Sequence, residues 1–481
     1  MSREILINVE AQEKRVAIVN NGMIEEFYIE RPQDKTIVAN IYKGKIEAVL
    51  PSLGAAFVDI GLAKKGFLYL SEIEHAFEPS DVRGSAPKKE IKKGQEVLVQ
   101  VVKESFGTKG PRLSCDIGLA GRYLVLMPQD NQIGVSRRIE DDEERKRLRQ
   151  VFAELKLPKD VGFIVRTAAS GKSKQELLRD ANFLLKLWRR IEKTIQGRKA
   201  PSLVYEEYDL VLRAIRDSFS EDVSKLIVDS KDEFFRVQRF MRTFLAYLTN
   251  RVELYRGHDL FEEKDIERQI SRIFESKVYL KSKAYLVIEP TEGLVVIDVN
   301  SGGFHKRFDQ EETAFKVNCE AAQEVARQLR LRDLGGIIVI DFIDMEKEGH
   351  RREVLNVLKK ALSTDRAKYD ILGISKFGVV EMTRERIHNT VQTITFQPCP
   401  YCQGKGKIRS VVTMSIYALK ELRRFLLKNR SVRQLNVTLN PAVVDEIFKN
   451  KSTLKNLEHS FRVKVNLVAN PASHLEDIKI V

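Results

Sequence analysis

The sequence predicts a multidomain protein that combines α/β and α+β folds. Its 481 residues are enough for about three to four domains, each with a core of its own. Residues 294 to 345 read as strand, helix and strand in immediate succession, which is typical of a parallel α/β unit. Residues 36 to 115 read as short strands punctuated by glycines, which is typical of a small β-barrel.

Composition points to a soluble protein with a polyanionic partner. Hydrophobic residues make up 43% and charged residues 31% of the chain. No apolar run approaches the roughly 20 residues that span a bilayer, so we expect a cytoplasmic protein without a membrane span. The excess of 82 Lys and Arg over 68 Asp and Glu gives a net charge of +14. This charge favours a polyanion, although it also serves solubility. Four cysteines are too few for a disulfide framework.

Two separated segments, 3 to 30 and 213 to 273, mix strands with other structure. The first alternates apolar and polar residues around Asn20-Asn21-Gly22, which predicts a hairpin or small sheet. In the second, residues 225 to 229 form the clearest strand. Asp229 ends it and invites a nuclease site with three carboxylates. Because its spacing offers no partner, we interpret Asp229 as structural.

Residues 36 to 115 favour a five-stranded OB barrel, and their sequence resembles RNA-binding modules first described in a ribosomal protein. Phe57 and Phe67 then lie on neighbouring strands, where they can stack on bases. The alternative is that both rings belong to the barrel core. We favour the surface because glycine and lysine residues surround Phe67. The lysines available for phosphates are Lys43, Lys45, Lys65 and Lys109.

Residues 116 to 212 contain a strand at 162 to 167 followed by Ser170-Gly171-Lys172-Ser173. The second stretch resembles part of a phosphate loop, but the leading half of the Walker pattern is missing, which excludes an NTPase site. Arg166 followed by a hydroxyl side chain can bind a terminal phosphate through charge-assisted hydrogen bonds. The helix expected from 174 to 195 carries Trp188 on its packing face.

The central unit comprises two strands, 294 to 300 and 337 to 341, joined by a helix. Both strands are rich in β-branched residues and are predicted to be buried on both faces. Asp309 with Glu312 fits a capping box at the start of the helix, and Gly335-Gly336 is expected to stop it. A right-handed crossover between parallel strands would bring both carboxyl ends to one edge of the sheet.

Asp298 and Asp341, at the ends of these strands, are the candidate metal ligands. Carboxylates held close repel each other unless a proton or cation intervenes, and Mg²⁺ typically takes one or two protein carboxylates. Asn300 points to the same side as Asp298 and can orient a phosphate or a metal-bound water. Asp344 has a weaker claim and is interpreted as supporting or structural. The alternative is that both aspartates merely cap helices or end strands.

The motif Cys399-Pro400-Tyr401-Cys402 has the form of a zinc knuckle, with two thiolates from one tight turn. Structural Zn²⁺ takes four ligands, so the simplest completion is the same pair from a second subunit. Zinc shared with His388 or bound elsewhere in the chain is the second interpretation. A redox pair is the third, because no thioredoxin-like context is evident around the motif.

The tail, residues 410 to 481, predicts a small α/β domain that binds RNA or supports a dimer. The sequence does not separate these two roles. The expected elements are a helix at 412 to 428, a strand at 435 to 439, two short helices and closing strands at 463 to 468 and 478 to 481.

Four motifs in this order resemble the signature of the bacterial ribonuclease E/G family. They are Asp298-Val299-Asn300-Ser301-Gly302-Gly303, the stretch from Arg327 to Gly336, Asp341-Phe342-Ile343-Asp344-Met345 and Cys399-Pro400-Tyr401-Cys402. The resemblance covers essentially the whole chain. It is closest to the ribonuclease G branch, because the chain stops after the small domain without a long disordered tail.

The resemblance implies a Mg²⁺-dependent endoribonuclease that cuts single-stranded RNA and leaves a 5′-phosphate and a 3′-hydroxyl. It implies a preference for 5′-monophosphorylated RNA, and roles in rRNA 5′-end processing and mRNA decay. The implied domains are a discontinuous ribonuclease H-like domain (1–35 and 213–273), an OB-fold domain (36–115), a 5′ sensor (116–212), a deoxyribonuclease I-like catalytic domain (274–395), a zinc-link (396–409) and the small α/β domain (410–481).

The resemblance also implies roles for individual residues. Asp298 and Asp341 would hold Mg²⁺ with Asn300 assisting, and Cys399 and Cys402 would share Zn²⁺ between the protomers of a homodimer, with a tetramer as the alternative assembly. Lysine at the last sensor position, where the family usually has arginine, keeps the charge but lacks the planar fork. The implied RNA-binding residues are Phe57, Phe67 and Lys109, and the implied 5′-phosphate sensor is Gly121, Val125, Arg166, Thr167 and Lys368.

Two competing functions belong to other classes. One is a non-catalytic RNA-binding scaffold that uses the barrel and the tail, with structural aspartates. The other is a deoxyribonuclease, which would cut DNA oligonucleotides equally well.

Overall fold

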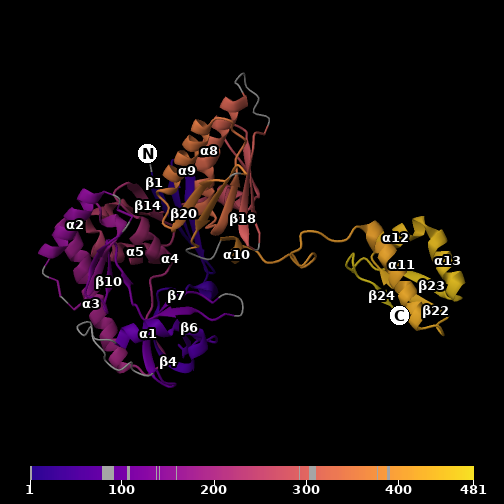
Figure 1. The fold of residues 1–481 in the computed structure, drawn as a ribbon, viewed down its shortest axis with the longest axis horizontal. Coiled ribbons are helices and arrows are strands. Elements are labelled where there is room, and N and C mark those ends of the chain that lie inside the picture. Colours follow the sequence, from indigo (N-terminus) through magenta and orange to yellow (C-terminus); the bar gives the residue numbers. More distant parts are fainter. Residues whose placement is uncertain are drawn as a thin grey trace. The chain divides into compact units, whose positions relative to one another are not determined.

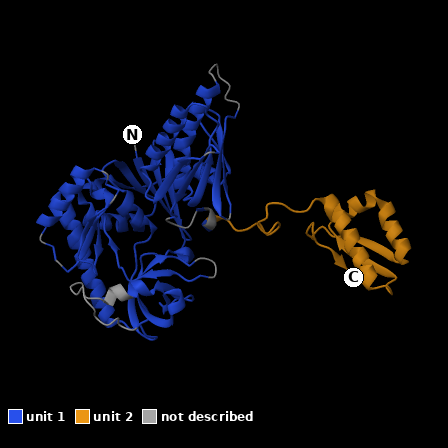
Figure 2. Cartoon of the chain, viewed as in Figure 1, with its two compact units in different colours: residues 1–394 blue, residues 395–481 orange. Residues whose placement is uncertain are grey.

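The computed structural model describes residues 3–77, 91–105, 109–136, 138–139, 141–155, 157–158, 160–291, 293–302, 310–375, 377–386 and 391–481. The chain divides into two compact units, residues 1–394 and residues 395–481 (Figures 1 and 2). In the described parts, the first unit contains four sheets and the second unit a fifth. None of the helices in these parts combines the length and apolar character needed to cross a membrane.

One five-stranded sheet joins segments far apart in the sequence. Its order is β15-β14-β1-β2-β3, in which β1 pairs in parallel with β14 and antiparallel with β2. The turn between β2 and β3 confirms the predicted hairpin, because Asn21 and Gly22 both adopt positive φ angles, 48° and 82°. The elements are β1 (Arg3–Val9), β2 (Lys14–Asn20), β3 (Met23–Glu30), β14 (Val223–Val228), β15 (Val252–Leu254), α4 (Leu210–Ser218), α5 (Lys231–Phe244), α6 (Leu260–Glu263) and α7 (Ile266–Ile273).

The second sheet closes into a five-stranded barrel, as the sequence predicts. Its strands run β4-β5-β6-β8-β7, and β7 pairs back onto β4. A side chain at Gly66 would collide with Leu113, so glycine there lets β6 and β8 approach closely. The elements are β4 (Ile41–Leu50), β5 (Ala55–Asp59), β6 (Gly66–Tyr69), β7 (Glu96–Lys103), β8 (Arg112–Ser114), the added strand β13 (Ser202–Tyr205) and α1 (Leu70–Phe77).

The third sheet, β11-β12-β10-β9, packs against two helices. The longer of them, α3, begins with a capping box between Ser173 and Glu176, and Trp188 packs against the core beneath it. The elements are β9 (Leu119–Ala120), β10 (Leu124–Met127), β11 (Ile133–Val135), β12 (Gly162–Val165), α2 (Asp142–Glu154) and α3 (Lys174–Gly197).

The fourth sheet is the central unit, with the order β16-β17-β18-β19-β21-β20 (Figure 1). As predicted, β18 and β19 are parallel. The prediction that both are buried on both faces is wrong. Ile297 and Ile340 face the core, whereas Val296 and Ile337 are 36% and 54% exposed, because α8 and α9 cover only one face. The elements are β16 (Lys277–Tyr279), β17 (Tyr285–Pro290), β18 (Leu294–Asn300), β19 (Gly336–Asp341), β20 (Tyr369–Ile374), β21 (Val379–Arg384), α8 (Gln310–Leu331) and α9 (Glu348–Leu362).

Helix α8 ends before the glycine pair that was expected to stop it. Asp333 adopts a left-handed conformation with φ 46°, and the Leu334 amide donates to the Leu329 carbonyl at 3.0 Å. The aspartate therefore terminates the helix, and Gly336, with φ 97°, opens β19. The predicted capping residue Asp309 lies outside the described residues.

The second unit contains the sheet β23-β22-β24 and three helices over its core. The expected order of helix, strand, two helices and two strands is present. The elements are α11 (Val411–Lys428), β22 (Gln434–Leu439), α12 (Pro441–Lys449), α13 (Lys451–Phe461), β23 (Lys464–Ala469) and β24 (Lys479–Ile480).

A buried arginine ties the central sheet to the loops around it. Arg384, at the end of β21, is 4% exposed. Its Nη1 donates to Asp333 at 2.8 Å and to the Leu334 carbonyl at 2.7 Å, and its Nε donates to Asp365 at 2.8 Å. One guanidinium thus pairs with two carboxylates and fixes both the end of α8 and the segment before β20.

We expect Arg384→Ala to destabilise the first unit by about 3–5 kcal/mol, because it removes the buried guanidinium with which Asp333 and Asp365 form ion pairs. Denaturant unfolding followed by tryptophan fluorescence and circular dichroism measures the loss. The control is Arg352→Ala in α9, whose ion pair with Glu348 is exposed and should cost less than about 1 kcal/mol. Equal midpoints for the two variants would contradict the structural role of Arg384.

Candidate active site

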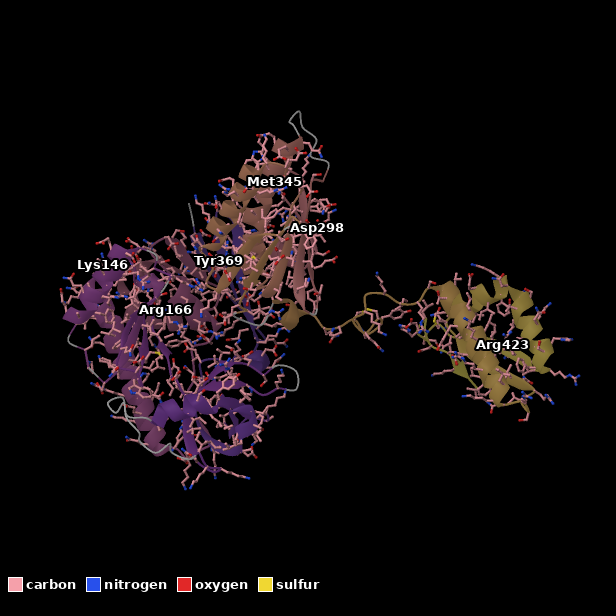
Figure 3. All side chains as sticks on the ribbon, in the orientation of Figure 1. Lys146, Arg166, Asp298, Met345, Tyr369 and Arg423 are labelled. Carbon is pink, nitrogen blue, oxygen red and sulfur yellow. The ribbon has the colours of Figure 1, made fainter. Side chains whose placement is uncertain are left out.

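Asp298 and Asp341 are direct partners across the parallel strands β18 and β19. Neighbouring strands lie about 4.8 Å apart, so the two carboxylates project side by side. Their neighbours Ile297 and Ile340 are fully buried beneath the helices, which places both aspartates on the open face of the sheet. Figure 3 labels Asp298 in the central unit. The predicted shared site for the two acids is therefore sterically possible.

The two acids repel each other in the absence of a cation. Partial burial raises the pKa of Asp341, and the charges of Asp298 and Asp344 raise it further. Asn300 lies on the same face and donates from Nδ2 to Asp298 Oδ2 at 2.7 Å. This hydrogen bond fixes one carboxylate oxygen and leaves the other free for a ligand.

The loop after Asp341 is held by α8. Asn318, which is fully buried, donates to the Ile343 carbonyl at 2.7 Å and accepts from the Ile343 amide at 3.0 Å. Glu311 accepts from the amides of Glu346 and Lys347 at 2.8 and 3.1 Å. Sequence reasoning missed both supports, although an asparagine among the small apolar residues of a helix face is a visible signal.

The two carboxylates suit a cation that needs few protein ligands. In the described parts of the chain, no group of three or more His, Cys, Asp or Glu side chains could hold a metal. Mg²⁺ keeps several waters and fits such a pair. Asp229, the other acid after a strand, is engaged by the Asn8 side chain at 2.7 Å and the Val9 amide at 3.0 Å.

The barrel presents aromatic rings on its outer face. Phe57 and Phe67 are paired across β5 and β6, half-buried, with ring centroids 6.2 Å apart. Their chain neighbours Val58 and Leu68 fill the barrel, so the two rings point outward. Tyr69 extends the row, 5.0 Å from Phe67. The rings are accessible to bases, as the surface interpretation expects.

The lysines near these rings differ in whether other groups of the chain already bind them. Lys109 is exposed, whereas Lys43 is bound by Glu96 at 2.9 Å and by the Arg198 carbonyl at 3.0 Å. A depression of about 550 Å³ lies beside Phe57. Its lining includes Lys64, Lys65 and Lys93.

Four of the five sensor residues come together around β10 and β12. The Arg166 guanidinium donates to the Gly121 carbonyl at 2.5 Å and to Asp217 at 2.8 Å. Thr167 follows Arg166, and Val125 lies on β10 opposite Ile164. Lys368 lies elsewhere, directly before β20. Two residues before Lys368, the Arg366 carbonyl accepts a hydrogen bond from Arg138 Nη1 at 2.7 Å. Arg138 follows β11, so this contact links the segment before β20 to the third sheet.

A buried carboxylate that sequence reasoning missed organises the loop after Gly121. Asp180 accepts from the amides of Arg122, Tyr123 and Leu124 at 3.2, 2.8 and 2.9 Å. A side chain at Gly121 would meet Asp180 Oδ2 at 2.6 Å. The sequence does indicate a buried carboxylate here, because Asp180 stands at helical spacing among the apolar residues of α3.

Asp217 is the second missed carboxylate. Burial alone would raise its pKa, but Arg216 and Arg166 beside it hold the pKa well below the usual range. Arg216 also pairs with Glu207 at 2.6 Å. Arg166 is therefore held in position by a permanent negative charge.

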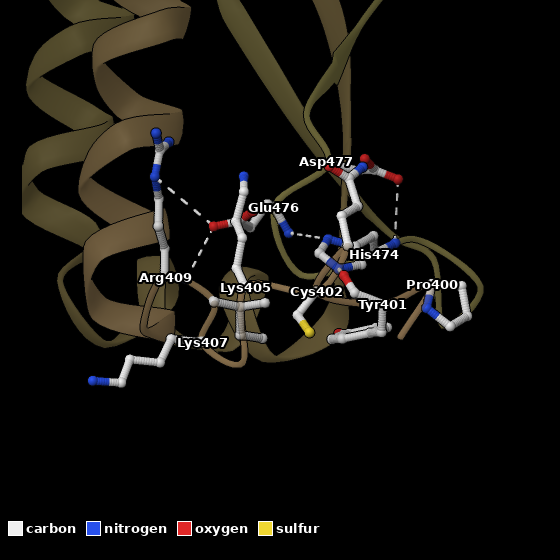
Figure 4. Close-up of a pocket in the computed structure, with 11 residues that line it drawn as sticks. Pro400, Tyr401, Cys402, Lys405, Lys407, Arg409, His474, Glu476 and Asp477 are labelled. Atoms are coloured by element: carbon white, nitrogen blue, oxygen red, sulfur yellow. Dashed lines mark hydrogen bonds and ion pairs between the residues drawn. The ribbon is translucent and has the colours of Figure 1, made fainter. Parts of the chain in front are cut away.

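The second unit carries the pair Cys399 and Cys402, and Figure 4 shows Cys402 with the residues around it. Backbone hydrogen bonds from Cys402 and Tyr401 lower the pKa of the Cys399 thiol, and the Gly406 amide donates to Cys402 Sγ at 3.3 Å. The lowered pKa favours the thiolate form of Cys399, the form that binds zinc. His474 is unavailable as a ligand, because Nε2 donates to the Tyr401 carbonyl at 2.6 Å and Nδ1 accepts from the Glu476 amide at 3.0 Å. His388 lies outside the described residues.

Three family models match the chain. The model described as the ribonuclease E/G family matches residues 118–387, and an S1 RNA-binding domain matches residues 35–116. A third, described as the RNase E/G thioredoxin-like domain, matches residues 398–481.

Curated relatives match over the full length of the chain. Proteins named ribonuclease G from Salmonella typhimurium (strain SL1344) and Escherichia coli (strain K12) are each 40% identical over 494 residues, covering 100% of both chains. A protein named ribonuclease E from Haemophilus influenzae is 41% identical and covers 98% of this chain and 51% of its own length. By these matches in sequence and length, the chain belongs to the ribonuclease E/G family.

Proposed function

We propose that the chain cuts single-stranded RNA by Mg²⁺-dependent hydrolysis at Asp298 and Asp341, leaving a 5′-phosphate and a 3′-hydroxyl. Membership of the ribonuclease E/G family makes the chain an endoribonuclease, and its S1 domain is an RNA-binding module. The observation that carries the proposed site is the register of β18 and β19, which makes the two acids direct neighbours on an open face.

Asp298 and Asp341 would hold the metal ion. When bound, Mg²⁺ polarises the scissile phosphate and lowers the pKa of a coordinated water. Asn300 orients the Asp298 carboxylate through its 2.7 Å hydrogen bond. Asn318 fixes the loop after Asp341, which keeps the second carboxylate beside the first. The barrel rings Phe57 and Phe67 would hold the strand by stacking, with Lys109 offering a charge to a phosphate.

We further propose that precursors of ribosomal RNA and mRNA are the substrates, in the cytoplasm. Within the first unit, we assign the sheet built from residues 3–30 and 223–254 to a ribonuclease H-like domain. The central sheet belongs to a deoxyribonuclease I-like domain. The support for the first assignment is the pairing of β1 with β14, and for the second the antiparallel edges around β18 and β19.

Asp298→Asn should reduce cleavage of labelled single-stranded RNA by more than about 100-fold while leaving RNA affinity nearly unchanged. The substitution removes one metal-binding charge, whereas loss of an outer-shell partner alone typically costs 10–100-fold. Gel assays with and without Mg²⁺ measure cleavage, and fluorescence anisotropy measures binding. Asp370→Asn, an exposed aspartate on β20 of the same sheet, is the control. Cleavage that Asp298→Asn retains at the parent rate would refute the assignment, and equal cutting of a DNA oligonucleotide would favour a deoxyribonuclease.

Arg166 and Lys368 should set the preference for a 5′-monophosphate. A charge-assisted hydrogen bond contributes about 1.5–3 kcal/mol, so Arg166→Gln should reduce the rate ratio between 5′-monophosphate and 5′-triphosphate RNAs by about tenfold. Lys368→Arg should raise the ratio, because it restores a planar fork. The paired RNAs are compared in one gel. A ratio that neither variant changes would mean that the end is recognised elsewhere.

We propose that Cys399 and Cys402 share one Zn²⁺ with the same pair of a second chain, forming a homodimer, with a tetramer as the alternative assembly. From the sequence, a redox pair ranks third because no thioredoxin-like context is evident. The family model for residues 398–481 is described as thioredoxin-like, so that argument no longer holds. Geometry still favours zinc. Low-pKa redox cysteines often sit at a helix N-terminus, whereas α11 begins at Val411, well after Cys402.

Removal of zinc should separate the two chains. We expect one zinc per two chains by elemental analysis, and a shift from dimer to monomer in sedimentation when Cys402 is replaced by serine. Cys115→Ser, which alters a buried cysteine of the barrel core, is the control. A dimer that persists without zinc, or an intramolecular disulfide between Cys399 and Cys402, would contradict the shared site.

A further inference from the structure

We propose that Tyr279, with Lys277 and Tyr285, forms a subsite for one nucleotide of the RNA strand beside the aspartate pair. In this subsite the Tyr279 ring stacks on the base and the Lys277 ammonium pairs with a phosphate. The inference deepens the proposed function, because it names a second point at which the cut strand is held. It concerns residues outside the four motifs that mark the family.

The sheet register carries these side chains to the face that bears the acids. Tyr279 on β16 pairs with Tyr285 on β17, and Tyr285 pairs with Asn300 on β18. Residues directly opposite one another share a face of the sheet. With strands about 4.8 Å apart, Tyr285 lies one strand from Asn300 and Tyr279 two strands away. The tyrosines therefore extend the row that starts at the candidate active site.

Tyr279 is open to solvent. Its side chain is 68% exposed, whereas Leu280 and Leu286 next to this row are 8% and 0% exposed within the core. Packing therefore does not explain a large aromatic ring at this position. A ring that stands free on an edge strand beside a nucleic-acid cleavage site offers a stacking surface to any base.

Lys277 supplies the positive charge. Its Nζ lies 3.6 Å from the centroid of the Tyr285 ring and 5.3 Å from that of Tyr279. The Tyr285 ring thus holds the ammonium in place by a cation–π interaction and leaves Tyr279 to the base. Among the described residues, no carboxylate forms an ion pair with Lys277. Lys65 on the barrel differs, because it is bound by Glu47 and Asp59.

A cation at this position offsets the repulsion between the aspartate pair and the RNA phosphates. Asp298 and Asp341 repel the phosphates that flank a cut, and Lys277 lies on the same row as Asp298, with Val287 between them. Attraction at one end of the row offsets repulsion at its centre. Because stacking is tolerant of sequence, the subsite fixes the position of the strand and does not select a particular base.

The direct test is RNA binding without catalysis. We expect Tyr279→Ala to weaken binding of a 5′-monophosphorylated single-stranded RNA in EDTA by about tenfold, since loss of one stacked base typically costs 1–3 kcal/mol. Tyr279→Phe should bind like the parent protein, because the ring is retained. Phe235→Ala, which removes a half-exposed ring from α5, is the control. Anisotropy gives the affinities, and circular dichroism checks the fold.

A series of RNAs with one abasic nucleotide each tests the contact itself. At one position beside the cleavage site, the parent protein should bind the abasic RNA about tenfold more weakly than the intact RNA. Tyr279→Ala should bind these two RNAs equally well, because the ring that stacks on this base is absent. Lys277→Gln should reduce the slope of log affinity against log salt by about 0.7, the value for one phosphate of a single strand. Lys277→Arg should keep the slope.

Three results would overturn the subsite. The first is unchanged binding by Tyr279→Ala, and the second is a loss of affinity in Tyr279→Ala that is equally large for every abasic RNA of the series. A change of oligomeric state in Tyr279→Ala would assign the ring to an interface between chains, and would also overturn it. Failure of the proposed function looks different, because the parent protein would then bind RNA but not cut it with Mg²⁺.

Discussion

The candidate active site depends on the parallel pairing of β18 with β19. That pairing sets Asp298 opposite Asp341, with one strand spacing between them. Partial burial raises the pKa of Asp341, and the neighbouring charge of Asp298 raises it further. Folding stability therefore has to come from elsewhere in the sheet. It comes from the apolar side chains beneath α8 and α9 and from the hydrogen bonds that Asn318 makes to the following loop.

Buried charges connect this sheet to the others in the first unit. Arg384 binds Asp333 and Asp365, while Arg366, adjacent to Asp365, donates to Ser218 at 2.7 Å. Asp217, next in the chain, holds Arg166. The segment from 365 to 366 thus contacts Arg384 at the end of the central sheet and Ser218, the chain neighbour of the Asp217 that binds Arg166. Buried pairs of this kind tolerate little displacement, because losing one partner leaves an uncompensated charge.

Periodicity and spacing predicted the parts of the site that are local in sequence. The two-residue alternation of a strand predicted that Asn300 lies on the same face as Asp298. The strand–helix–strand order predicted that Asp341 lies at the same edge of the sheet. The same strands misled about burial, because a run of Val and Ile does not reveal whether helices cover one face or two. Asp180 and Arg384 could not be paired from sequence, because their partners lie 56 to 58 and 19 to 51 residues away and meet them only after folding. Asp333 ends α8 by adopting a left-handed backbone conformation, whereas the sequence predicts that Gly335-Gly336 ends the helix.

Asp180 has one further consequence for how the loop after Gly121 can meet an anion. Its carboxylate already satisfies the amides of Arg122, Tyr123 and Leu124. The peptide groups in this bend are saturated by an internal acceptor, so the bend is rigid before any ligand arrives. An incoming phosphate finds no free main-chain donors at these three positions, so its hydrogen bonds have to come from other groups around the bend.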